Sequence, residues 1–150
     1  MTDSKAKQVR FDRNLARFFS VVVAAFVFLI GFWALPRDVA DIDDIRPTEV
    51  NIEDMTVRFS GIGLTKRVAN SHYERSIQCG PTRYNVNTLS FVTQPGGPAP
   101  IDFLIDIPPL VPRGVACKLV IESSHEFNIL FLPKTTTDKW ESSSFVIGEV

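Results

Sequence analysis

The sequence predicts a mostly β protein with one N-terminal transmembrane α-helix and a small antiparallel β-sandwich on the exported side. Three observations carry this prediction: an uncharged apolar run near the N-terminus, opposite charges on its two sides, and apolar–polar alternation interrupted by Gly and Pro in the remainder. With 150 residues and 45% hydrophobic content, the chain can form one ordinary domain and a short additional segment. The formal net charge of -1 gives no reason to expect a nucleic-acid partner.

Residues 1–17 are expected to form a basic cytoplasmic tail, and residues 18–36 a single-pass transmembrane signal-anchor helix. The run from Phe18 to Leu35 has no ionisable side chain, and its length of about 27 Å nearly matches a hydrocarbon core of roughly 30 Å. Its one polar side chain, Ser20, can donate a hydrogen bond to the carbonyl one turn earlier. A buried helix in a globular core is the alternative, but such a helix usually has a polar stripe.

A cleaved signal peptide is the stronger rival to an anchor, since it also pairs a basic start with an apolar middle. The run exceeds the roughly 7–15 apolar residues of a signal peptide, and no site of the A-x-A type follows it. The flanking charges then orient the helix with its N-terminus in the cytoplasm of an inner (plasma) membrane and its C-terminal domain in the periplasm or extracellular space. The basic residues before the span are Lys5, Lys7, Arg10, Arg13 and Arg17, and the acidic ones after it are Asp38, Asp41, Asp43, Asp44, Glu49, Glu53 and Asp54.

Small residues give the span one face that another helix can approach. Ser20, Ala24 and Gly31 fall on this face at 3.6 residues per turn. They motivate the hypothesis of helix packing within a membrane assembly. The alternative is that the helix only holds the domain at the lipid bilayer.

Residues 37–54 are expected to form an acidic stalk, because spaced carboxylates and Pro47 resist burial. Residues 55–150 are expected to form the extracytoplasmic sandwich, immunoglobulin-like in architecture. The clearest strand signal is 101–107, where four large apolar residues alternate with Asp102, Leu104 and Asp106. Further strands are expected at 49–59, 73–79, 83–92, 115–122, 127–132 and 144–150, with Phe127, Ile129 and Phe131 sharing one face and "QPGGPAP" (94–100) as a loop.

Cys79 and Cys117 are predicted to form a disulfide, since both lie on the side where disulfides persist. The alternative couples them with His72 and His125 in a copper or zinc site. Such sites usually include a closely spaced pair such as C-x-x-C, which is missing here, so no metal or other cofactor is expected. Both histidines are instead expected at the surface or at strand edges.

No catalytic constellation is evident, and the chain is not expected to be an enzyme. Two histidines without a G-x-S-x-G elbow do not indicate a nucleophile, and Asp102 and Asp106 are about 13 Å apart along a strand. Surface contacts are therefore the expected mode of action. The interaction candidates are Trp140, which is either exposed or folded back on the sheet, and Pro95 and Pro98 of the 94–100 loop.

These observations predict a membrane-anchored accessory or scaffold protein whose exported β domain docks onto a partner protein in a membrane complex. Two alternatives stay open at this point. One is a periplasmic thiol-dependent copper chaperone, and the other is a phage-encoded lysis or superinfection factor.

Overall fold

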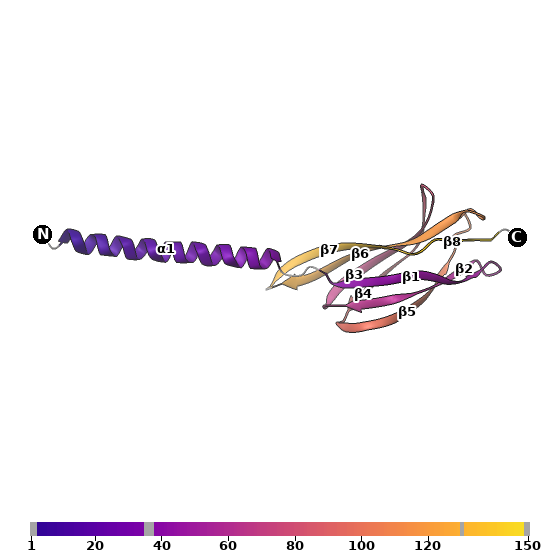
Figure 1. The fold of residues 1–150 in the computed structure, drawn as a ribbon, viewed down its shortest axis with the longest axis horizontal. Coiled ribbons are helices and arrows are strands. Elements are labelled where there is room, and N and C mark those ends of the chain that lie inside the picture. The colour runs from indigo at the N-terminus through magenta and orange to yellow at the C-terminus, as the bar shows by residue number, and fades with distance from the viewer. Residues whose placement is uncertain (1–2, 35–37, 130, 149–150) are drawn as a thin grey trace. The chain divides into compact units, whose positions relative to one another are not determined.

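The computed structural model describes residues 3–34, 38–129 and 131–148. The chain divides into two compact units, Met1–Arg37 and Asp38–Val150. Within the described ranges, the first unit holds one helix and the second holds eight strands in two antiparallel sheets (Figure 1). The predicted mostly β fold is therefore confirmed at this level.

Helix α1 spans Asp3–Ala34. The hydroxyl of Ser20 donates a hydrogen bond of 2.9 Å to the carbonyl of Ala16, as the sequence predicts. All side chains from Leu15 to Gly31 are exposed. Within the described residues, we find no helix whose length and hydropathy meet the requirement for crossing a bilayer. The predicted anchor ends with Leu35 and Pro36, which lie outside the described residues.

Sheet A contains β1 (Ala40–Asn51), β2 (Thr56–Thr65) and β5 (Gly96–Asp106), in the order β1-β2-β5. Sheet B contains β3 (Ala69–Cys79), β4 (Thr82–Thr93), β6 (Ala116–Ile129) and β7 (Leu132–Glu141), in the order β4-β3-β6-β7. The short β8 (Phe145–Val146) pairs with the first residues of β6, whereas the first residues of β7 pair with the last residues of β6. The strands β4 and β5 are consecutive in sequence but form edges of different sheets.

One hydrophobic core lies between the inner faces of the two sheets. Val57, Phe59 and Ile105 enter it from sheet A, and Ile77 and Leu119 enter it from sheet B. The rings of Phe59 and Phe145 meet edge to face with centroids 5.4 Å apart, which is a favourable aromatic geometry. The domain is therefore sandwich-like, and alternation of buried residues is clearest along β3 and β6.

Residues 40–51 differ from the acidic stalk expected at 37–54. They form β1, which pairs with β2 from Ala40↔Thr65 to Asn51↔Thr56, and Ile45 is buried. The carboxylates do not prevent pairing, because β1 is an edge strand whose outer face can keep charges in water. The compact unit accordingly begins at Asp38 and not at residue 55.

The expected loop at 94–100 is also shorter than predicted. Only Gln94 and Pro95 lie outside strands, and β5 begins at Gly96. Pro98 and Pro100 lie within β5, and a sheet accepts proline on an edge strand, where a missing N–H need not break a ladder.

The expected strand pair at 115–122 and 127–132 is a single long strand, β6, followed by a turn. Phe127 and Ile129 are buried as predicted, but Phe131 does not share their face. Phe131 has φ of 69° and is 98% exposed, because the chain reverses there to enter β7. Leu130 lies outside the described residues.

Candidate functional site

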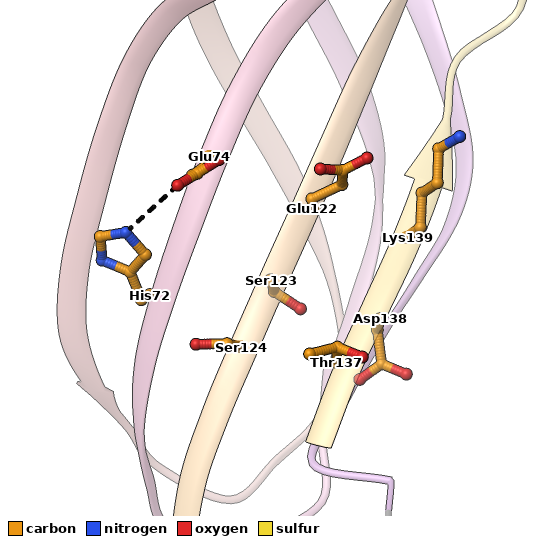
Figure 2. Close-up of a pocket in the computed structure, with 8 residues that line it drawn as sticks. All are labelled: His72, Glu74, Glu122, Ser123, Ser124, Thr137, Asp138 and Lys139. Carbon is orange, nitrogen blue, oxygen red and sulfur yellow. Dashed lines mark ion pairs between the residues drawn. The ribbon is translucent and has the colours of Figure 1, made fainter. Parts of the chain in front are cut away.

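A polar hollow of about 410 Å³ lies on the outer face of sheet B (Figure 2). Alternation along three neighbouring strands places its side chains in two rows across the sheet. One row pairs His72 with Ser124 and Thr137, and the other pairs Glu74 with Glu122 and Lys139. Ser123 and Asp138 complete the lining.

The ionisable side chains in the two outer rows of the polar hollow have partners at the surface. His72 Nε2 lies 3.8 Å from Glu74 Oε1. The guanidinium of Arg83 donates a hydrogen bond of 2.8 Å to Glu122 and thereby lowers the pKa of that carboxyl. The ammonium of Lys139 lies 2.9 Å from Glu141, whose pKa Lys118 and Lys139 together lower to about 2. Exposed pairs of this kind add little stability.

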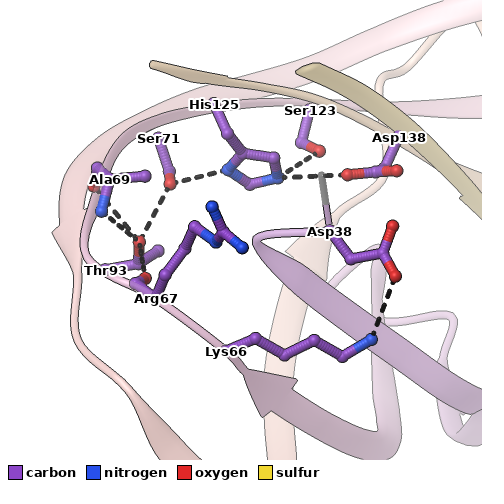
Figure 3. Close-up of polar contacts among 9 residues, drawn as sticks. All are labelled: Asp38, Lys66, Arg67, Ala69, Ser71, Thr93, Ser123, His125 and Asp138. Carbon is purple, nitrogen blue, oxygen red and sulfur yellow. Dashed lines mark hydrogen bonds and ion pairs between the residues drawn. The ribbon is translucent and has the colours of Figure 1, made fainter. Parts of the chain in front are cut away.

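A second polar group, the histidine cluster, lies on the inner face of sheet B (Figure 3). It consists of Ser71, Thr93, Ser123, His125 and Asp138. The His125 ring is 0% exposed and has a hydroxyl at each nitrogen: Ser71 Oγ is 2.7 Å from Nδ1, and Ser123 Oγ is 2.8 Å from Nε2. The cluster joins β3, β4, β6 and β7 through side chains.

The cluster contains an ionisable pair, in which the His125 ring is buried and the Asp138 side chain is partly exposed. The Asp138 Oδ2 atom lies 3.6 Å from His125 Nε2, and it has no hydrogen-bond partner among the described residues. Burial lowers the pKa of His125, and the Asp138 carboxylate opposes this shift. Burial raises the pKa of Asp138, opposed by His125. Desolvation therefore favours the neutral form of both groups.

The cluster contains the residue types of a hydroxyl nucleophile, but its geometry supports packing. Ser71 is 3% exposed, and both nitrogens of His125 already face hydroxyls, which is the geometry of a hydrogen-bonded packing network. The expected position of His125 at the surface or a strand edge was wrong. Its alternation with Leu119, Ile121 and Phe127 along β6 was the signal that places it on the inner face. His72, by contrast, is exposed.

The structure brings two of the predicted site residues together. Cys79 and Cys117 are direct partners across β3 and β6, and their sulfur atoms are 2.05 Å apart, at disulfide distance. Among the described residues, no cluster of three or more His, Cys, Asp or Glu side chains could hold a metal ion.

The remaining predicted residues do not meet at one place. Trp140 is half-buried and packs against the core, with its ring stacked 6.4 Å from that of Tyr73. Pro95 and Pro98 are exposed at the start of β5. Ser20, Ala24 and Gly31 are exposed on α1. The outer rows of the polar hollow were not predicted as a site, because strand register decides which outer residues become neighbours.

No protein-family model matches the chain, and no curated protein matches it.

Proposed function

We propose that this protein is a non-enzymatic accessory or scaffold subunit, anchored in a membrane by α1, whose β domain docks onto a partner protein through the polar hollow. The observation that carries the proposal is the surface of α1. The described residues between Leu15 and Gly31 include one ionisable side chain, Arg17, and every side chain in this stretch is exposed. A stretch of helix that is apolar on all sides, as α1 is after Arg17, is best accommodated by lipid or by other helices.

The polar hollow is the part of the domain best suited to a protein partner. It gathers imidazole, carboxylate, hydroxyl and ammonium groups from three strands within one concave surface. These groups offer a partner several directional hydrogen bonds. A partner with a protruding polar loop fits this surface.

The architecture that we propose for the domain is immunoglobulin-like. In such folds, chain-order strands 1, 2 and 5 share one sheet and strands 3, 6 and 7 share the other. Sheet A has the order β1-β2-β5, and β3, β6 and β7 are neighbours in sheet B. Here β4 extends the second sheet, and the cysteine pair joins strands within one sheet instead of bridging two.

Alkaline carbonate extraction of isolated membranes tests the anchor. We expect the full chain to stay in the pellet, because extraction removes peripheral proteins but leaves helices embedded in lipid. A variant with Val23→Asp and Phe26→Lys, which puts two charges into the apolar stretch, should appear in the supernatant. Recovery of the unmodified chain in the supernatant would contradict the anchor.

A photo-crosslinking amino acid at Ser124, in the centre of the polar hollow, tests the docking surface. We expect one defined protein to be crosslinked there and to copurify with the full chain in mild detergent. Thr48, on the exposed outer surface of sheet A, is the matched control position. Equal crosslinking of the same protein at both positions would contradict docking through the hollow.

A further inference from the structure

A second cavity lies between the two sheets and arises from the sequence of β2. Val57 and Phe59 fill the core, but the next inward positions of β2 are Gly61 and Gly63, which have no side chains. A Cβ atom at Gly63 would lie 3.0 Å from Ile101 Cγ2. The space above Gly63 is therefore bounded on one side by the Ile101 side chain of the neighbouring strand β5. The sheets consequently leave a cleft of about 360 Å³, which we call the inter-sheet cleft.

Most of the inter-sheet cleft is apolar. Tyr73 and Phe91 line it from sheet B with their rings stacked 5.1 Å apart, and Ile101 and Phe103 line it from sheet A. Phe91 is 51% exposed although it lies on a β4 position paired with buried Ser71. The volume is at the lower end of the range of about 300–1,000 Å³ that small-molecule pockets occupy.

One cation enters this apolar space. The guanidinium of Arg75 lies on the inner side of β3, with Cζ 4.7 Å from the centroid of the Phe103 ring. Asp41 and Asp102 also line the cleft, but no described carboxylate lies within ion-pair distance of Arg75, and Asp102 accepts a hydrogen bond from Arg58 instead. Burial lowers the pKa of Arg75, which reflects the cost of holding this charge away from water.

A half-buried arginine that lacks a carboxylate partner can be paired by a bound anion. Guanidinium groups bind carboxylates with two parallel hydrogen bonds, and these are stronger where water is excluded. The rest of the lining offers aromatic and aliphatic surface. The combination of a single cation and an apolar cavity selects a ligand with one anionic end and one apolar tail.

We propose that the inter-sheet cleft binds a single-chain amphiphile with a carboxylate head, such as a medium-chain fatty acid. The head pairs with the Arg75 guanidinium, and the hydrocarbon tail lies among Tyr73, Phe91, Ile101 and Phe103. This site is on the inner side of the sheets, so it is independent of the polar hollow and of the partner proposed above.

Photolabelling of the full chain in zwitterionic phospholipid nanodiscs tests the site. The probe is decanoic acid with a terminal diazirine, and the comparison probe is the corresponding diazirine-bearing decanol. We expect the acid to label peptides of β3, β4 and β5 at least tenfold more than the alcohol does, and unlabelled decanoate to suppress this labelling. Labelling only of residues 15–31 would show simple partition into lipid and would overturn the proposal, as would equal labelling by the two probes.

Substitutions then assign the head group to Arg75. Arg75→Gln should reduce labelling of the cleft by the acid at least tenfold, and Arg75→Lys should reduce it less, because the charge is kept but the paired hydrogen bonds are lost. Arg113→Gln, an exposed arginine outside the cleft, is the control and should leave labelling unchanged. Unchanged labelling of a folded Arg75→Gln variant would overturn the proposal.

A second variant addresses the cavity without changing charge. Gly63→Ala should reduce labelling several-fold, because its methyl group displaces the Ile101 side chain. Near-UV circular dichroism of each variant reports whether it is folded. If Arg75→Gln does not fold, the Gly63→Ala variant and the comparison of the two probes test the proposal instead. If a peptide with a free C-terminal carboxylate suppressed the labelling of the cleft and decanoate did not, the proposal of an amphiphile as the ligand would also be overturned.

Discussion

At the residue scale, His125 shows how one polar side chain can be accommodated inside a sheet domain. A fully buried imidazole is tolerable only if its nitrogens have hydrogen-bond partners. Ser71 and Ser123 supply these partners from β3 and β6. The ring also meets Tyr73 edge to face at 5.5 Å. The hydroxyls therefore satisfy the neutral ring, whereas protonation would place a charge in the core.

Domain stability should consequently fall as the pH is lowered from about 7. The pKa of His125 is lowered in the folded state, so below the ordinary histidine pKa of about 6.5 the unfolded chain binds more protons than the folded chain. The loss can reach at most about 1.4 kcal/mol per pH unit, the value for one proton. Urea unfolding at a series of pH values measures it.

Asp138 acts in the opposite direction. Its pKa is raised in the folded state, so protonation of this carboxyl stabilises the fold as the pH falls through its raised pKa, and it opposes the loss from His125 there. His125→Gln should flatten the pH dependence near pH 6.5. A slope that survives in His125→Gln would show that other groups cause it.

At the element scale, the cysteine pair links the two central strands of sheet B. Cys79 is the last residue of β3, and Cys117 is near the start of β6, 38 residues later. Closing a loop of that length reduces the entropy of the unfolded chain.

The double variant Cys79→Ala, Cys117→Ala should lower the free energy of unfolding by about 3–4 kcal/mol. Denaturant unfolding of the full chain under oxidising conditions measures this change. Reductant should have a similar effect on the unmodified chain and no effect on the double variant. A loss well below 1 kcal/mol would mean that the pair contributes little.

Helix α1 offers a separate test through its small-residue face. A Cβ added at Gly31 meets nothing within 4 Å, so α1 itself accepts a larger side chain there. Ala24→Leu with Gly31→Leu should reduce association with another membrane helix about tenfold if small residues allow close approach. A membrane two-hybrid assay measures this, and Val22→Leu on the opposite face is the control. Undiminished association would favour a helix that only anchors.

At the scale of the whole molecule, charge asymmetry predicts the orientation of the chain. Five basic residues stand in residues 1–17, and the segment after the apolar run is acidic. The cysteine pair provides a reporter, because a disulfide persists only on the oxidising side of the membrane.

Replacement of all five basic residues of 1–17 by Gln should invert the membrane orientation of part of the protein population. We expect the fraction with oxidised Cys79 and Cys117 to fall, as measured by thiol alkylation and gel shift. Conversion of Lys134 and Lys139 to Gln is the matched control, since these residues are far from the apolar run in sequence. An unchanged oxidised fraction in the tail variant would contradict orientation by the tail.

The sequence by itself determined the features that depend on local periodicity. The alternation at 101–107 predicted a strand with Ile105 buried, and the uncharged run after Arg17 predicted a helix, which the structure shows as part of α1. Each of these signals lies within a single segment. The bilayer span, the exported location and the partner stay predictions.

The tertiary structure alone decided which distant segments became neighbours. The acidic residues 40–51 form a strand because β2 offers them a ladder, and the inter-sheet cleft lies where Gly63 of sheet A and the aromatic rings of sheet B line the same space. The environment of His125 likewise needs Ser71 from β3 and Asp138 from β7. Burial and pairing are properties of the space between strands, and that space is set by register and sheet order, which no single segment encodes.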